Sequence, residues 1–157
     1  MTKNIVKRYK GFWFYGLSGS GKTFASNFLR KKIQNSFVID GDYIRRVISK
    51  DLSYSLKDRA YQIDRMHSLA LLAINNKTFP LVSTVFMNKK VIKNAKKNKI
   101  LIIKIVRQDM ESIKEVHKTY KINKDVIGKH IFLPPIKTNE IINTGDKKFK
   151  DELNKFL

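Results

Sequence analysis

The sequence predicts an α/β fold in which helices cover both faces of a parallel β-sheet. Segments with the short apolar runs of strands alternate with segments of helical spacing, and this alternation is typical of βαβ units. The run 100–106 is rich in isoleucine and valine, as expected of a central strand that is buried on both faces. A glycine-rich loop joins the first strand to the first helix. Together these features favour three layers, with helices on either side of one sheet.

Five segments have the composition of strands. The first is the aromatic run Phe-Trp-Phe-Tyr between Gly11 and Gly16, and the second ends in the carboxylate of Asp40. The last is a pair of isoleucines that precedes a turn at Thr144-Gly145. In chain order, the expected strands are residues 12–15, 37–40, 80–86, 100–106 and 141–142.

Six segments are expected to form helices. The longest begins at Ser55, where Ser-Leu-Lys-Asp has the form of a capping box, and it continues with apolar residues at helical spacing through Ala73. Asp109 can cap the helix after the fourth strand. The segment 117–135 is polar, basic and irregular, which suits a mobile loop over a ligand. In chain order, the expected helices are residues 24–29, 43–48, 55–73, 89–97, 110–116 and 147–157.

The composition favours one ordinary domain. With 157 residues, the chain is long enough for a single domain, residues 1–157, with a buried core. It has no cysteine, which excludes disulfides, thiolate metal sites and a cysteine nucleophile. The apolar stretch near the basic N-terminus is too short for a secretion signal, and no apolar run is long enough to span a bilayer. We therefore expect a cytoplasmic protein that does not bind membranes.

The chain is strongly basic, with 33 Lys and Arg residues against 13 Asp and Glu residues and a net charge of +20. Such an imbalance attracts anionic partners such as nucleotides, RNA or lipid head groups without choosing among them. The lysines are densest between positions 89 and 99, but they are not interleaved with aromatic residues as in a groove for single-stranded nucleic acid. A solvated, lysine-rich surface is the simpler interpretation, so nucleic acid is not an expected partner.

A phosphate-binding motif follows the first strand. Residues 16–23 match G-x-x-x-x-G-K-[ST] at every fixed position and lie between a strand and a helix, as the motif requires, so we expect the fold of the P-loop NTPases. Glycines let backbone N–H groups close around a phosphate chain, and the N-terminus of the following helix points at the same anion. Lys22 would reach the β and γ phosphates of ATP, and the Thr23 hydroxyl would bind Mg²⁺. The expected ATP-binding residues are Gly16, Ser18, Gly19, Ser20, Gly21, Lys22 and Thr23.

Two carboxylates follow the second strand, at the edge of the sheet where an acceptor substrate should bind. Gly41 lets the chain turn after Asp40, and Asp42 would then begin a helix with its carboxylate facing the cleft. Carboxylates there can hold Mg²⁺ or take the proton of an attacking hydroxyl, so Asp40 is a candidate metal ligand and Asp42, with Lys22, a candidate catalytic residue. Arg45, one turn on, can bind an anionic substrate. The alternative is that Asp42 only caps its own helix.

These motifs resemble those of the adenylylsulfate kinase family, whose members phosphorylate the ribose 3′-hydroxyl of adenosine 5′-phosphosulfate. The resemblance is specific through about Arg65. It is carried by Gly16-Leu17-Ser18-Gly19-Ser20-Gly21-Lys22-Thr23, by Asp40-Gly41-Asp42 with Arg45, by the segment 50–59, and more weakly by Val126-Ile127-Gly128, Pro134-Pro135 and Ile141-Ile142-Asn143.

The resemblance implies substrate-binding roles for five residues. Tyr54 would stack on the base of the acceptor, and Arg45 and Arg59 would hold its phosphate and sulfate oxygens. Gln62 lies where the family has asparagine, which keeps an amide and lengthens its reach. The implied substrate-binding residues are Asp42, Arg45, Tyr54, Arg59 and Gln62.

The chain departs from the family pattern at two places. After the third strand the family has Phe-Ile-Ser-Pro, whereas residues 85–88 read Val-Phe-Met-Asn. The family's loop over the site has an Arg-Asp pair followed by Lys-Gly-Leu-Tyr, whereas residues 115–121 read Glu-Val-His-Lys-Thr-Tyr-Lys. Lys118 and Lys121 remain as sources of positive charge for a transferring phosphoryl group. His117 and His130 lie in the same loop, and contact with substrate is open for both.

The leading hypothesis is an ATP- and Mg²⁺-dependent kinase that phosphorylates the ribose 3′-hydroxyl of adenylyl sulfate. The altered segments also fit a related kinase for another activated nucleotide, such as cytidine diphosphoramidate. The charge of +20 leaves a nucleotide-dependent RNA-binding module as a third hypothesis, although Asp40, Asp42 and Arg59 have no purpose in it. Small nucleotides are the expected partners, and the sequence leaves the oligomeric state open, a homodimer included.

Overall fold

The fold is built on one parallel β-sheet of five strands. The computed structural model describes residues 4–157. Each pair of neighbouring strands is parallel, in the order β2-β3-β1-β4-β5. The strands are β1 (Gly11–Tyr15), β2 (Ser36–Asp40), β3 (Phe79–Thr84), β4 (Ile100–Arg107) and β5 (Asn139–Asn143).

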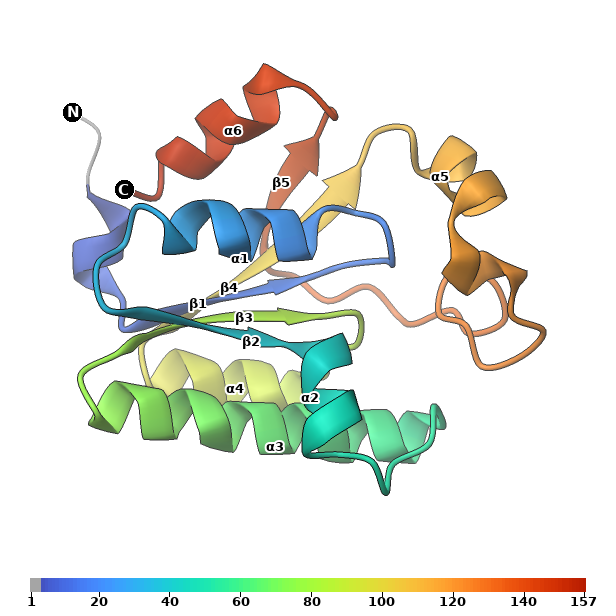
Figure 1. The fold of residues 1–157 in the computed structure, drawn as a ribbon, viewed down its shortest axis with the longest axis horizontal. Helices are drawn as coiled ribbons and strands as arrows, with labels where there is room; N and C mark the ends of the chain where they lie inside the picture. The colour runs from blue at the N-terminus through green and yellow to red at the C-terminus, as the bar shows by residue number, and fades with distance from the viewer. Residues whose placement is uncertain (1–3) are drawn as a thin grey trace.

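Helices cover both faces of this sheet, so the prediction of a three-layer α/β/α fold is confirmed. In Figure 1, α1 and α6 lie on one face, and α3 and α4 lie on the other. The α-helices are α1 (Lys22–Arg30), α2 (Gly41–Val47), α3 (Leu56–Asn75), α4 (Lys89–Lys97), α5 (Met110–Val116) and α6 (Lys147–Asn154). Two 3₁₀ helices that the sequence pattern did not indicate are η1 (Ile5–Arg8) and η2 (Lys118–Lys121).

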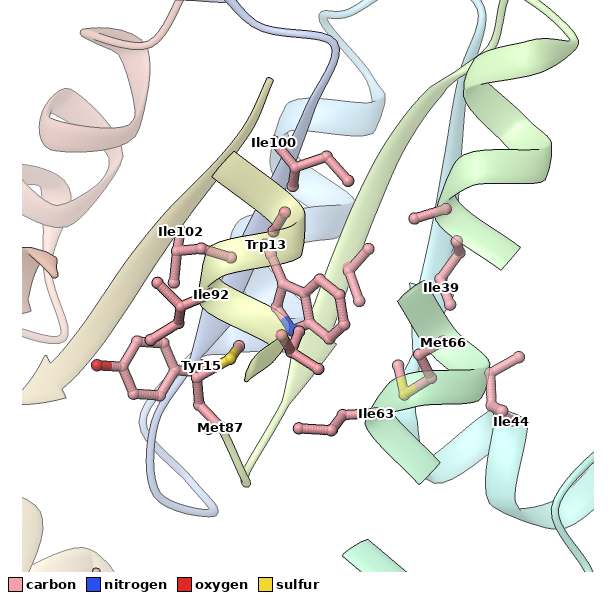
Figure 2. Packing of buried hydrophobic residues seen from close by; sticks show 14 residues of the cluster. Trp13, Tyr15, Ile39, Ile44, Ile63, Met66, Met87, Ile92, Ile100 and Ile102 are labelled. Atoms are coloured by element: carbon pink, nitrogen blue, oxygen red, sulfur yellow. The ribbon is translucent and has the colours of Figure 1, made fainter. Parts of the chain in front are cut away.

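The aromatic strand β1 is the middle strand, and its alternating side chains anchor both cores. Phe12 and Phe14 are buried in the cluster that includes residues of α1 and α6, whereas Trp13 and Tyr15 are buried in the cluster on the side of α3 and α4. Figure 2 shows Trp13 on that second side, among isoleucines of the sheet and helices. Because the side chains on both faces of β1 are buried, the phosphate loop begins at the end of a rigid strand.

The strand 100–106 is an interior strand, as its composition predicts, although β1 rather than β4 is the middle one. Residues of β4 pair with β1 on one side and with β5 on the other. Most other boundaries differ from the predicted ones by a few residues. The third strand, for example, ends at Thr84 instead of residue 86, because the chain bends away from the sheet after Thr84.

Of two predicted helix caps, one is half formed and the other is absent. At the start of α3, the Ser55 hydroxyl accepts from the Asp58 N–H at 3.2 Å, but the Asp58 carboxylate accepts from the N–H and hydroxyl of Ser53, so the capping box is half formed. The prediction that Asp109 caps α5 is wrong. Asp109 occupies the N-cap position, but its carboxylate is taken by the Arg107 side chain at 2.5 Å.

The carboxyl ends of the strands gather the loops that matter for function. The chain moves from β1 to the β2 and β3 side of the sheet and later to the β4 and β5 side, which makes the end of β1 a topological switch point. The glycine loop after β1, helix α2 after β2 and helix α5 after β4 all lie at this edge (Figure 1). None of the helices in residues 4–157 is long and apolar enough to cross a membrane. That residues 1–157 form a single domain stays a prediction.

Two substitutions in α3 test whether this helix is held by its buried face. Met66 is fully buried between the helix and the sheet, and Leu72, on the same helix, is 60% exposed. Met66→Ala is expected to lower the free energy of unfolding by about 2–5 kcal/mol, because it leaves a cavity. Leu72→Ala is expected to change it by less than about 0.5 kcal/mol. Urea unfolding of both variants measures the contrast, and equal losses would contradict the packing described here.

Candidate active site

The loop 16–23 between β1 and α1 has the conformation of a phosphate cradle. Gly19 and Gly21 have φ values of +83° and +103°, which other residues rarely adopt. Packing makes the same demand: a Cβ at Gly19 would lie 2.5 Å from Ile113 Cγ2, and a Cβ at Gly21 would lie 2.4 Å from the Asn143 amide nitrogen. Glycines are therefore needed here both for the turn and for the close approach of α5 and β5.

The cradle borders a pocket of about 330 Å³. The phosphate loop and the first residues of α1 form one wall, and residues 40–42 with the end of β3 form another. The third wall consists of His117, Lys118 and Thr119, which lie in the segment after α5. The pocket thus brings together segments that are up to a hundred positions apart in the sequence. Of the seven predicted ATP-binding residues, Ser18, Gly19, Gly21, Lys22 and Thr23 line it, whereas Gly16 and Ser20 do not.

Lys22 is the buried cation of this pocket. Its side chain is only 8% exposed, and its ammonium group donates a hydrogen bond to the Leu17 carbonyl at 2.7 Å. Burial lowers the pKa of Lys22 from 10.5 to about 8, an effect that the carboxylates of Asp42 and Asp40 partly oppose. A bound polyphosphate would supply the negative charge that the two carboxylates only partly provide.

Asp40 is a carboxylate with four hydrogen bonds, and they rule out the alternative that Asp42 caps its own helix. Its Oδ1 atom accepts from the N–H groups of Asp42 and Tyr43, at 3.0 and 3.2 Å, so Asp40 caps α2 and Asp42 does not. Its Oδ2 atom accepts from the hydroxyls of Thr23 at 2.9 Å and Ser83 at 3.1 Å. The helix begins at Gly41, one residue earlier than a helix opened by Asp42.

The residues around Asp40 fit a magnesium ion. Mg²⁺ prefers hard oxygen ligands and is usually held by one or two carboxylates together with phosphate oxygens and waters. The Thr23 hydroxyl and the Asp40 carboxylate lie 2.9 Å apart at the mouth of the cradle. Within residues 4–157 there is no cluster of three or more His, Cys, Asp or Glu side chains that would hold a metal by itself. The donor set therefore suits an ion that arrives with a nucleotide.

Asp42 lies where this pocket meets a second, smaller one. Its exposed carboxylate borders both the 330 Å³ pocket and a neighbouring hollow of about 50 Å³. The smaller hollow is also lined by Arg45, Tyr54, Arg59 and Gln62, so the structure brings together all five residues that the family resemblance implied.

The two arginines of the smaller pocket share one aromatic ring and hold their own loop. Their guanidinium carbons lie 4.5 Å (Arg45) and 5.3 Å (Arg59) from the centre of the Tyr54 ring. Arg45 donates to the carbonyls of Leu52 and Ser53, and Arg59 donates to those of Tyr54 and Asp125. Burial lowers the pKa of Arg59, and the like charge of the nearby Arg45 adds to this effect.

Gln62 is buried and lines the same pocket as these arginines, and only the nitrogen of its amide has a hydrogen-bond partner among the described residues. Its Nε2 group donates to the Gly41 carbonyl at 3.0 Å, and because a carbonyl only accepts, this contact fixes the orientation of the amide. The Oε1 atom is buried and has no hydrogen-bond partner among the described residues. Such an orphaned acceptor is suited to a hydroxyl or amine of a ligand.

Three residues that support the site were missed by sequence reasoning. The Ser83 hydroxyl binds Asp40, the Tyr120 hydroxyl donates to the Ser18 carbonyl at 2.9 Å, and the Asn143 amide donates to the Ser20 carbonyl at 2.8 Å. Asn143 ends β5 at the same edge of the sheet as the phosphate loop, so its position after an apolar strand was the one available signal. The pairing of Tyr120 with Ser18 spans 102 positions and has no local signature.

The family model and curated adenylyl-sulfate kinases point to the same family. The family model described as "Adenylylsulphate kinase" matches residues 9–124. The adenylyl-sulfate kinase of Buchnera aphidicola subsp. Acyrthosiphon pisum is 42% identical over 77 residues, which are 46% of this chain and 37% of that protein. The bifunctional enzyme CysN/CysC of Xylella fastidiosa is 35% identical over 80 residues, or 48% and 13% of the two chains. The matched segments thus span much less than two thirds of the relatives' own length.

A solved structure supports the same fold over nearly the whole chain. The Mycobacterium tuberculosis APS kinase CysC, solved in complex with AMPPNP and APS, matches with a TM-score of 0.78 at 22% identity. The match covers 94% of this chain and 97% of the mycobacterial one. The P-loop kinase architecture that the sequence predicts is therefore confirmed.

The buried charge of Lys22 leads to a prediction about stability and pH. In the unfolded chain Lys22 has its ordinary pKa of 10.5, against about 8 in the folded protein, so below pH 8 both states carry the charge and the folded state bears its burial cost of roughly 3 kcal/mol. Between pH 8 and 10.5 Lys22 loses its proton in the folded state and keeps it in the unfolded state, so the burial cost decreases as the pH rises. Lys22→Met loses the hydrogen bond to the Leu17 carbonyl, but it also removes the burial cost of the charge. Because the burial cost is the larger of the two, the variant is expected to be more stable than the natural protein at pH 7.

The measurement is urea unfolding of both proteins at pH 7 and pH 9. The advantage of Lys22→Met should shrink by about 1 kcal/mol over that interval, because less of the burial cost remains at the higher pH. Lys31→Met, which removes the same charge from an exposed position at the end of α1, serves as the control for net charge. A Lys22→Met protein that is less stable at pH 7, or an advantage that does not change with pH, would contradict the buried-cation interpretation.

Proposed function

The chain belongs to the adenylylsulfate kinase family, and on that premise we propose that it transfers the γ-phosphoryl group of ATP to the ribose 3′-hydroxyl of adenylyl sulfate. The observation that supports this proposal best is the place of Asp42. Its carboxylate borders the phosphate cradle on one side and the pocket of Arg45 and Arg59 on the other. A hydroxyl at that junction would face both a base and the terminal phosphoryl group. The mycobacterial relative, solved with AMPPNP and APS, binds ligands of these two kinds.

On the donor side, the phosphates of ATP would lie in the cradle. Backbone N–H groups of residues 16–23 and the N-terminus of α1 would bind the phosphate oxygens, and Lys22 would place its charge on the β and γ phosphates. Thr23 and Asp40 would hold Mg²⁺, which neutralises charge on the phosphate oxygens when it is bound. Because Asp40 is fixed by its four hydrogen bonds, this part of the site is pre-organised before nucleotide arrives.

On the acceptor side, the two guanidiniums would bind the phosphate and sulfate oxygens. Arg45 and Arg59 are held close together on the Tyr54 ring, and an anion between them would relieve their mutual repulsion. The Tyr54 ring is 53% exposed, which leaves area for stacking on the base of the acceptor. Asp42 would orient the 3′-hydroxyl and accept its proton as the new P–O bond forms.

The segment after α5 would supply further positive charge to the transferring group. Of the two lysines that the sequence leaves open for this role, Lys121 donates to the Glu115 carbonyl, whereas Lys118 borders the pocket and has no protein partner among the described residues. Lys118 is thus the better placed to stabilise charge that develops on the phosphoryl oxygens.

Two residues favour a second acceptor: Gln62, which lines the smaller pocket, and Met87, in the segment after β3, which does not line it. Gln62 and Met87 stand where the family has asparagine and, in the segment after β3, an active-site serine. The amide oxygen of Gln62 is buried and has no hydrogen-bond partner among the described residues, and the Met87 side chain is buried as well. A related activated nucleotide with an amine donor, such as cytidine diphosphoramidate, would pair with that oxygen.

The direct test of the proposed function is an assay with ATP, Mg²⁺ and adenylyl sulfate. The natural protein is expected to form the 3′-phosphorylated product, and Asp42→Asn is expected to lower kcat by at least about 100-fold, because an amide cannot accept the proton. ATP affinity should change little in this variant, since Asp42 lies at the acceptor end of the pocket. Product from cytidine diphosphoramidate but not from adenylyl sulfate would replace the substrate and keep the reaction.

A second prediction separates Lys118 from the other basic residues of the same segment. Lys118→Gln is expected to lower kcat by about tenfold or more, because it removes a charge that acts on the transition state. Lys124→Gln makes the same change of net charge at an exposed position outside the pocket and should leave kcat within about twofold. Steady-state kinetics at one ionic strength compares them, and equal effects would show that only the overall charge matters.

A further inference from the structure

The segment after α5 is fastened directly onto the phosphate loop. The Tyr120 side chain is 5% exposed, and its hydroxyl donates to the Ser18 carbonyl at 2.9 Å. In the preceding helix α5, Ile113 packs so closely on Gly19 that a Cβ there would lie 2.5 Å from its methyl group. This segment therefore forms a fixed wall of the nucleotide pocket in this structure, and its side chains have defined positions relative to the cradle.

His117 lies at the point of closest approach. It follows α5 and closes that helix, since its N–H donates to the Ile113 carbonyl at 2.8 Å. Its ring borders the pocket, and its Cδ2 atom lies 3.3 Å from the position that a Cβ at Gly19 would occupy. The ring of Tyr120 packs edge-to-face on it, with 6.0 Å between the ring centres, which limits its rotation.

The hydrogen bonds of His117 fix which ring nitrogen carries the proton. The Thr119 N–H donates to Nδ1 at 3.2 Å, and a backbone N–H can only donate, so Nδ1 must be the acceptor. In the neutral ring the proton is therefore on Nε2. Nε2 is bonded to Cδ2, the atom that borders Gly19, and no protein acceptor takes its hydrogen in the part of the chain that the structure describes. The ring thus presents an unused N–H donor beside the phosphate cradle.

We propose that the Nε2–H group of His117 donates a hydrogen bond to an oxygen of the terminal phosphoryl group of the bound nucleotide. This inference rests on the proposed function, since it needs a nucleoside triphosphate in the cradle. The terminal group is the one in question because the pocket that His117 borders also contains Asp42, where the acceptor hydroxyl would approach. His117 would then be a catalytic residue on the wall opposite Asp42, in a segment that lacks the family's arginine.

The competing explanation is that His117 only caps η2 through Nδ1. His130 provides the comparison, because its Nδ1 accepts from the Val126 N–H at 3.3 Å in the same kind of contact. His130 is exposed, however, and is not among the residues that border the nucleotide pocket. A histidine that only caps a turn therefore need not border the nucleotide pocket, as His117 does.

Two substitutions separate the donor from the cap. In His117→Asn the side-chain oxygen takes the place of Nδ1 and keeps the cap, but no N–H reaches as far as Nε2. In His117→Gln the amide N–H reaches the position of Nε2, but the cap is weakened. Calorimetry with AMPPNP and with ADP, in the presence of Mg²⁺, measures their effects, and thermal unfolding shows that each variant is folded.

The donor role predicts a specific pattern. His117→Asn should bind AMPPNP about tenfold more weakly than the natural protein, and His117→Gln should stay within about threefold of it. ADP, which lacks the terminal group, should bind all three proteins alike. His130→Asn and His130→Gln should change neither affinity.

Each other outcome has a defined meaning. Weaker AMPPNP binding in His117→Gln than in His117→Asn would assign His117 the cap alone and overturn the proposal. Equal AMPPNP affinities for the two variants, or equal losses for AMPPNP and ADP, would overturn it as well. Failure of the natural protein to bind AMPPNP would remove the proposed function itself, whereas normal binding that is insensitive to position 117 removes only this inference.

Discussion

The burial of one positive charge is the constraint on which the rest of this site depends. Lys22 begins α1, and its ammonium group is turned into the protein against the Leu17 carbonyl, where burial lowers its pKa. Two carboxylates offset the cost only in part, because Asp40 is engaged with hydroxyls and backbone N–H groups. The surrounding glycines and the rigid strand β1 hold the ammonium group in place. The carboxylates neutralise its positive charge only in part, and the phosphates of a bound polyphosphate would neutralise the rest.

The same principle distinguishes functional cations from the general basicity of the chain. Many surface charges have ordinary partners, as in the pairs of Arg65 with Asp51 and Lys90 with Asp64. Arg45 and Arg59 are different, because among the described residues their guanidiniums donate only to backbone carbonyls, and they lie close to each other on the Tyr54 ring. Net charge therefore reports little about function here, whereas burial sets Lys22 and the two arginines of the smaller pocket apart from the exposed cations.

The sequence was sufficient for the features that depend on local pattern. The aromatic run before a glycine loop and a helix predicts β1, the cradle and α1, because each of these follows from spacing alone. It was insufficient where one carboxylate has several candidate partners. Asp109 turns to Arg107 instead of capping α5, and Asp40 rather than Asp42 caps α2, since the neighbours that compete for each carboxylate are set by the tertiary fold. The use of Nδ1 by His117 depends on backbone geometry that no spacing encodes.

The segment between α5 and β5 shows how a chain with little regular structure can still hold a defined wall. Lysines and an arginine fasten it through backbone carbonyls: Lys129 donates to those of Tyr120 and Ile122, and Arg59 donates to that of Asp125. The last contact joins this wall to the acceptor pocket, because the same guanidinium lies on Tyr54. One side chain, Arg59, therefore contacts both the Tyr54 ring of the smaller pocket and the segment between α5 and β5.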